Sequence, residues 1–147
     1  MKTIKGNLIT MAKEGKFDVI VHGCNCYHVM GGGIARQIKD NFPEAYEADL
    51  ASPKGDIKKL GTYTKTELGN LTIVNAYTQY SYGFGTKQVD YDAVRKVFKR
   101  IRLKFPDKKI AYPMIGAGLG GGNWDTISEI IDEELSGMNH TLVILER

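Results

Sequence analysis

The sequence has few of the features that mark membrane-spanning, secreted or metal-binding proteins. No apolar run reaches the roughly 18 residues that a membrane span requires, and the first residues, MKTIKGN, lack the apolar core of a signal peptide. The only two cysteines, Cys24 and Cys26, are too close in sequence for a disulfide between them to cross-link distant parts of the fold. With no second cysteine pair they do not make a zinc site. These absences predict a soluble, cytoplasmic protein with no membrane association.

Charge of one sign is not in large excess either. A net charge of +3 over 147 residues is too mild to indicate nucleic-acid binding on its own. The three histidines, His22, His28 and His140, are not in ligand spacing with each other or with carboxylates, so we expect chemistry without a metal ion or other cofactor. The length fits one compact domain, residues 1–147, with a single core.

Glycine is present and clustered. Eight of the 17 glycines fall in two short segments, residues 31–33 and 116–122. Because glycine loses much backbone entropy on ordering, such clusters beside apolar runs indicate places where the backbone turns sharply or comes close to another group. The alternative is that these glycines only permit tight packing of helices on strands.

The spacing of apolar residues predicts alternating strands and helices. We expect strands at residues 17–24, 61–68, 71–77, 109–115 and 141–145, and helices at residues 33–42, 43–51, 92–105 and 125–135. Gly69-Asn70 is a hairpin turn signal, so the strands on either side should pair antiparallel, and Asp90 or Asp92 is placed to cap the helix that follows. The alternation predicts an α/β fold, a three-layer α/β/α sandwich with a central mixed sheet.

Both glycine clusters follow a predicted strand and lead into a predicted helix. In such sheets, ligands bind outside the carboxyl ends of the strands. Backbone N–H groups at a glycine-rich turn and at a helix N-terminus carry partial positive charge and can hold an anion without a basic side chain. Two such turns facing one crevice indicate a ligand with two or more phosphates, although neither cluster fits the P-loop or the dinucleotide-binding pattern.

Four segments together resemble the macrodomain family of ADP-ribose-binding modules: KGNLIT (5–10), DVIVHGCN (18–25), MGGGIA (30–35) and PMIGAGLGG (113–121). The likeness is strongest to the small, single-domain branch that contains ADP-ribose 1″-phosphate phosphatases. It implies that the chain binds ADP-ribose and hydrolyses its 1″-phosphate to ADP-ribose and phosphate. Two alternatives stay open: a hydrolase that removes ADP-ribose from modified proteins or nucleic acids, and a non-catalytic reader of ADP-ribose.

The resemblance also implies which residues bind the ligand. Asn7, followed by Leu8, stands where the family commonly has an Asp that accepts from the adenine amino group, and Asn25 matches the asparagine that binds the distal ribose. The first loop, which approaches the distal ribose and the diphosphate, matches Gly31, Gly32, Gly33 and Ile34. The second loop, which wraps the diphosphate, matches Ile115, Gly116, Ala117, Gly118, Leu119, Gly120 and Gly121.

Two departures from the family pattern bear on the mechanism. Gly120 stands where relatives often carry an aromatic residue or an Asp, and the chain reads Tyr77-Thr78-Gln79 where one hydrolase branch carries its reactive lysine. The resemblance therefore gives no support to a reaction through a lysine adduct.

Three residues are the candidates for catalysis. Asn25 would position the ribose, while His22 at a strand end and His28 on the first loop could move protons near neutral pH. The alternative for His22 is a half-buried ring that is hydrogen-bonded to a neighbouring loop, and for His28 an exposed position in the loop. The segment at residues 80–87, rich in aromatics and ending in Lys87, is a possible lid over the site or an ordinary surface loop.

Overall fold

A six-stranded mixed sheet forms the centre of the protein. The computed structural model describes residues 1–83, 88–118 and 120–146. The strands run in the order β1 (Lys2–Gly6), β6 (His140–Leu145), β5 (Ile110–Tyr112), β2 (Val19–Cys24), β4 (Leu71–Tyr77) and β3 (Tyr63–Leu68). Neighbouring strands are parallel except for β3 and β4, which form the antiparallel hairpin predicted from Gly69-Asn70.

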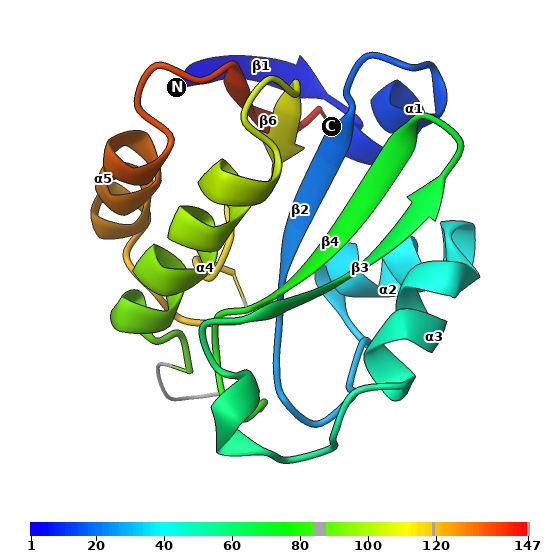
Figure 1. Ribbon diagram of the computed structural model, residues 1–147, viewed down its shortest axis with the longest axis vertical. Coiled ribbons are helices and arrows are strands. Elements are labelled where there is room, and N and C mark those ends of the chain that lie inside the picture. Colours follow the sequence, from blue (N-terminus) through cyan, green and yellow to red (C-terminus); the bar gives the residue numbers. More distant parts are fainter. Residues whose placement is uncertain (84–87, 119, 147) are drawn as a thin grey trace.

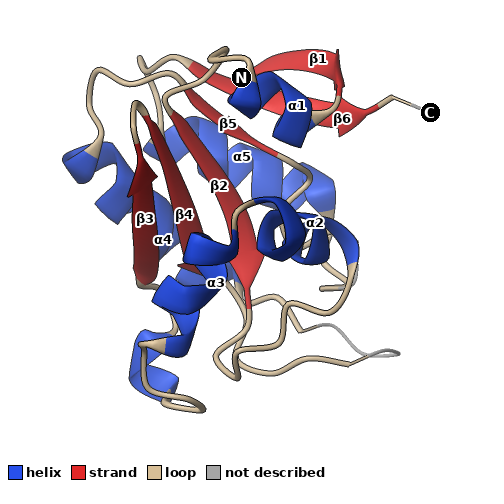
Figure 2. Ribbon diagram, turned by 90° about the vertical axis from the view of Figure 1, so that its right-hand side faces the viewer, coloured by secondary structure: helices blue, strands red, loops and turns tan. Residues whose placement is uncertain are grey.

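Helices cover both faces of the sheet (Figures 1 and 2). One face carries α4 (Tyr91–Lys104) and α5 (Trp124–Glu134), and the other carries α1 (Leu8–Lys13), α2 (Gly33–Asn41) and α3 (Pro43–Leu50). A short 3₁₀ turn, η1 (Ile57–Lys59), precedes β3. The arrangement confirms the predicted three-layer α/β/α sandwich, and within the described residues no helix is long and apolar enough to cross a bilayer.

Strand β2 shows why the sheet is buried on both faces. Its side chains alternate, so Val19 and Val21 pack in the core under α4 and α5, while Ile20 packs in the core under α1, α2 and α3. A continuous run of β-branched residues suits a strand that meets apolar helices on either side. The run therefore predicts the central position of this strand.

The main differences from the predicted elements lie at the end of β5 and at the start of the chain. The strand predicted at 109–115 ends at Tyr112, because Pro113 has no N–H to continue the ladder. Strand β1 and helix α1 have no counterpart among the predicted elements. β1 is an edge strand in which Ile4 is the only large apolar residue, so its sequence carries little alternation.

Two histidines of the sheet, His22 and His140, have buried rings. His22 is fully buried on β2 and contacts Asn75 Oδ1 through Nε2 at 2.7 Å, and His140 is buried with Nδ1 2.6 Å from Tyr112 Oη. Burial is the main cause that lowers the pKa of both rings below the ordinary value of 6.5. Both rings are therefore neutral at physiological pH.

We expect the free energy of unfolding to fall as the pH drops below about 6.5, because the unfolded chain then binds protons that the folded chain rejects. Each such proton contributes a slope of up to about 1.4 kcal/mol per pH unit. Urea unfolding at several pH values measures this slope. His22→Gln, which keeps a polar contact and removes the titration, should show a shallower slope than the wild type, and an identical slope would contradict a neutral, buried His22.

Candidate functional site

Two glycine-containing loops face each other across a pocket. Residues 25–32 follow β2 and residues 113–123 follow β5, which is the parallel neighbour of β2. A pocket of about 400 Å³ lies between these loops at the carboxyl ends of the strands. Its lining includes the predicted residues Asn25, Gly31, Gly32, Gly33, Ile34, Ile115, Gly116, Gly118 and Gly120.

The remaining loop residues and the lid fall into three groups. Ala117 and Gly121 belong to the second loop but do not line the pocket. Leu119 and Lys87 lie outside the described residues. Of the predicted lid, Tyr82 and Gly83 line the pocket, and Tyr82 is about half exposed.

A second pocket adjoins the first on the side of β6 and β1. It measures about 490 Å³, includes Asn7 and Leu8, and shares Gly33, Ile34, Pro113 and Met114 with the first pocket. Asn7 also caps α1, since its Oδ1 accepts from Thr10 N at 3.0 Å. The two pockets together form one elongated groove, with Asn7 at one end and Asn25 toward the other.

The N-terminus of α2 opens onto this groove without a side-chain cap. Helices α1, α4 and α5 are capped by Asn7, Asp90 and Asn123, respectively, so of the two predicted candidates Asp90 and Asp92 it is Asp90 that caps α4. Helix α2 starts after Gly32, which has no side chain to bond the first-turn N–H groups. Within residues 1–83, 88–118 and 120–146, no acceptor is recorded for these groups, which lie beside the pocket at the positive end of a nine-residue helix.

Glycines of the second loop divide into two kinds. A Cβ on Gly116 would lie 2.7 Å from Val89 Cγ2, and its φ of +73° favours glycine, so this residue is needed for the loop to pack on the core. A Cβ on Gly118 would meet no heavy atom of the described residues within 4 Å, apart from its immediate chain neighbours. Gly118 therefore leaves open space at the pocket, whereas Gly116 holds the loop's own shape.

Asn25 organises the first loop and still faces the pocket. Its Oδ1 accepts from Tyr27 N at 2.9 Å and Val29 N at 3.3 Å, and its Nδ2 donates to Val29 O at 2.8 Å. These contacts fix which end of the amide is oxygen and occupy both acceptor sites. Among the described residues, Val29 O is the acceptor recorded for Nδ2, so its second hydrogen is available to a ligand.

The structure does not bring His22 to the pocket. Asn75 Nδ2 donates to Ala45 O at 2.9 Å, so Asn75 Oδ1 faces His22 and His22 Nε2 must be the donor. His22 is wholly buried in this arrangement and does not line either part of the groove. The alternative for this residue is right that the ring is hydrogen-bonded within the protein, but the ring is fully buried and its partner Asn75 lies on strand β4, not on a loop.

Cys24 lines the pocket next to His22 but is not an activated thiol. Its Sγ lies 3.6 Å from His22 Nε2 and 3.7 Å from His22 Nδ1. Burial, with a contribution from the charge of Asp49, raises the pKa of the Cys24 thiol well above its usual range. A protonated thiol is a poor nucleophile, so the cysteine and histidine side chains do not form a nucleophile and base pair here.

His28 also lies outside the pocket lining. Its backbone has a φ of +64°, and its Nε2 donates to Ser52 O at 2.8 Å. The ring thus ties the first loop to the segment after α3. Neither histidine candidate contacts the groove, and of the three candidates only Asn25 does.

Gln79 is a pocket residue that the sequence analysis did not assign as a candidate. It follows β4, the other parallel neighbour of β2, so its backbone ends at the same edge of the sheet. Its position after a predicted strand is the signal that could have identified it. Residues that follow the parallel neighbours of β2 end at the same edge of the sheet as the pocket.

Charge is absent from the described lining of the groove. None of the described residues around either pocket is Asp, Glu, Lys, Arg or His. Within the part of the chain that the structure describes, no group of three or more His, Cys, Asp or Glu side chains could hold a metal ion. The described lining therefore offers an anion backbone N–H groups, side-chain amides and the Tyr82 hydroxyl, and no charged side chain.

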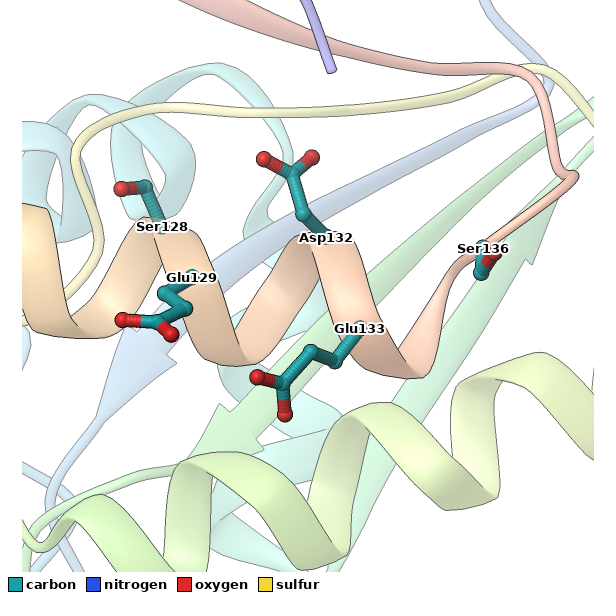
Figure 3. A pocket seen from close by; sticks show the side chains of 5 residues that line it. All are labelled: Ser128, Glu129, Asp132, Glu133 and Ser136. Atoms are coloured by element: carbon teal, nitrogen blue, oxygen red, sulfur yellow. The ribbon is translucent and has the colours of Figure 1, made fainter.

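A different hollow lies along α5 and suits an anion poorly (Figure 3). It measures about 670 Å³ and is lined by Ser128, Glu129, Asp132, Glu133 and Ser136. Figure 3 shows Glu129 and Glu133 on one side of α5 and Asp132 on the opposite side, and Glu133 pairs with Arg95 Nη2 at 2.8 Å. These carboxylates would repel phosphate groups, so the groove between the glycine-containing loops is the better candidate site.

Curated relatives match nearly the whole chain. An uncharacterized 17.5 kDa protein of Enterobacteria phage T4 is 38% identical over 97% of this chain and 95% of its own length. An ADP-ribose 1″-phosphate phosphatase of Candida albicans is 29% identical over 88% of this chain and 90% of its own length. A DNA ADP-ribosyl glycohydrolase of Thermus aquaticus is 27% identical over 94% of this chain, but this match covers only 38% of that longer protein.

The fold and the family model agree with these relatives. The macrodomain of Thermus aquaticus DarG superposes with a TM-score of 0.74 at 23% identity, over 99% of this chain and 97% of that one. The model of the Macro domain family matches residues 21–131, a range that contains both glycine-containing loops. The chain therefore belongs to the Macro domain family.

Proposed function

We propose that the groove binds ADP-ribose and that the protein hydrolyses ADP-ribose 1″-phosphate to ADP-ribose and phosphate. The observation that carries this proposal is the uncapped N-terminus of α2, which opens onto an elongated groove whose described lining carries no charge. Free N–H groups at a helix start are a ready site for a phosphate group. A diphosphate in the middle of the groove would meet them directly.

The groove offers a different environment at each end of such a ligand. The end beside β1 and β6 is lined by apolar residues such as Leu8, Ile34 and Val143, with the amides of Asn7 and Gln37 at its edge. This combination suits an aromatic base, whose faces are apolar and whose rim bears hydrogen-bonding groups. The other end carries the amides of Asn25 and Gln79, which suit the hydroxyl groups of a sugar.

The proposed reaction transfers a phosphoryl group to water. The bond between phosphorus and O1″ breaks, a bond from phosphorus to the water oxygen forms, and a proton from that water ends on the O1″ hydroxyl of ADP-ribose. Donors fixed before the substrate arrives stabilise the charge on the phosphate oxygens without reorganising. The remaining Nδ2 hydrogen of Asn25, toward the end of the groove opposite Asn7, is such a donor.

Removal of ADP-ribose from a modified macromolecule is the second candidate. The match to the DNA ADP-ribosyl glycohydrolase of Thermus aquaticus favours it, because the alignment covers 94% of the present chain. The phosphatase of Candida albicans favours the first candidate, because that match covers 90% of a protein named for the phosphatase reaction. The two reactions differ in the product released, which makes them separable in one experiment.

We expect the protein to bind ADP-ribose and to release inorganic phosphate from ADP-ribose 1″-phosphate. Calorimetry with ADP-ribose measures the binding, and a phosphate assay with the 1″-phosphate measures the turnover. Parallel incubations with ADP-ribosylated DNA and ADP-ribosylated protein, followed by detection of free ADP-ribose, test the second candidate. Binding without any turnover would leave a non-catalytic reader, and no binding would overturn both hydrolase proposals.

We expect Gly118→Val to weaken ADP-ribose binding at least about tenfold while leaving the fold intact. The added side chain would enter space that the ligand needs, and the protein offers no contact that opposes it. Calorimetry measures the affinity, and thermal unfolding checks the fold. Gly116→Val is the matched comparison: it should lower the unfolding temperature, since its Cβ would lie 2.7 Å from Val89 Cγ2. Wild-type affinity in Gly118→Val would show that the second loop does not contact the ligand.

A further inference from the structure

Gln79 is held in place by its own backbone at the end of the groove opposite Asn7. An isolated antiparallel bridge joins it to Val89, and its carbonyl oxygen accepts from Cys26 Sγ at 3.6 Å. Gln79 follows β4 while Asn7 follows β1, and the sheet order places β6, β5 and β2 between these strands. With neighbouring strands about 4.8 Å apart, the two residues lie at opposite ends of the groove.

The side chain of Gln79 has its nitrogen bonded to the backbone and its oxygen beside Gly120, which lines the pocket. Its Nε2 donates to Ser81 O at 2.8 Å, and because a carbonyl can only accept, this contact fixes which end of the amide is nitrogen. Among the described residues, no donor is recorded for Gln79 Oε1. The oxygen is therefore available to a group in the pocket that Gln79 lines.

Gly120 provides the space for this oxygen. A Cβ on Gly120 would lie 3.0 Å from Gln79 Oε1 and 2.8 Å from Gly116 O. Gly120 O in turn accepts from Gln88 N at 2.8 Å and Val89 N at 3.1 Å, so the loop cannot retreat without losing these bonds. A Cβ at position 120 would clash with Gly116 O and would press on Gln79 Oε1, which would have to move away. The glycine at position 120 therefore lets Gln79 keep its present position.

We propose that Gln79 determines specificity at the terminal end of the ligand, where its Oε1 accepts a hydrogen bond from a hydroxyl group of the terminal ribose. This inference rests on the proposed function, because it takes ADP-ribose as the ligand. A carboxamide oxygen is a neutral acceptor, so it selects a hydroxyl donor and does not repel a phosphate group attached next to that hydroxyl. A carboxylate of the same shape would accept the same bond and repel the phosphate.

The test compares two charge-changing variants at opposite ends of the groove. Gln79→Glu adds a negative charge beside the terminal ribose, and Gln37→Glu adds the same charge at the end lined by Asn7 and Leu8. Affinity for ADP-ribose comes from calorimetry. Affinity for ADP-ribose 1″-phosphate comes from the concentration dependence of phosphate release, or from calorimetry if it is not hydrolysed. Thermal unfolding verifies that each variant is folded.

We expect Gln79→Glu to weaken the binding of ADP-ribose 1″-phosphate about tenfold more than that of ADP-ribose. Gln37→Glu should weaken both by a similar factor, because its charge lies far from the terminal phosphate. Gln79→Met, which removes the acceptor at similar length, should weaken ADP-ribose roughly five- to tenfold. A merely structural role of Gln79 would lower both affinities together and leave their ratio unchanged.

The outcomes separate this inference from the proposed function. If the wild type binds ADP-ribose and Gln79→Glu shows the same ratio of affinities as Gln37→Glu, the role of Gln79 is overturned while ADP-ribose binding stands. If the folded wild type binds neither ligand, the proposed function is overturned, and the role of Gln79 with it.

Discussion

The parallel pairing of β2 with β5 on one side and β4 on the other is the constraint on which the candidate site depends. It brings three segments to one edge of the sheet: the first loop after β2, the segment after β4 and the second loop after β5. Backbone bonds then join them, from Cys26 N to Tyr80 O at 3.0 Å and from Gln88 N to Gly120 O at 2.8 Å. These bonds constrain the described parts of the three segments, which lowers the ordering entropy that ligand binding would have to overcome.

A buried polar cluster under the first loop positions that loop more than it stabilises the fold. Tyr77 Oη donates to Asp49 Oδ1 at 2.6 Å, and Lys59 Nζ lies 3.8 Å from the same oxygen and 3.5 Å from Cys26 O. Burial, reinforced by the bond to Asp49, raises the pKa of Tyr77, so the phenol remains a donor. Buried ion pairs often gain little net stability, because desolvation offsets the attraction. Here the cluster links α3 and η1 to the backbone of the loop that follows β2.

Local chemistry made part of this structure predictable. Gly69-Asn70 predicted the hairpin, Asp90 predicted the start of α4, and the apolar run through Val19 predicted a strand buried on both faces, because each signal acts within a few residues. The loops that line the pocket were predicted for the same reason, since glycine clusters after strands are visible in the sequence. What the sequence did not indicate was set by tertiary contacts. Asn75 accounts for the buried position of His22, and the location of Gln79 at the pocket follows from strand order.

The neutrality of the described lining has a consequence for how the proposed ligand would be recognised. Fixed dipoles at the start of α2 can hold phosphate oxygens but do not distinguish one phosphate from another, because the N–H groups are alike. Discrimination between ligands must then come from the two ends of the groove, where Asn7 and Gln79 present side-chain amides. The hydrogen bonds of Asn7 Oδ1 and of Gln79 Nε2 fix which end of each amide is oxygen. Amides discriminate through geometry, since a group that cannot satisfy them leaves a polar atom without a partner. In the proposed complex, the centre of the groove supplies affinity for the diphosphate, while Gln79, and the glycine at position 120 that makes room for it, decide which terminal group is accepted.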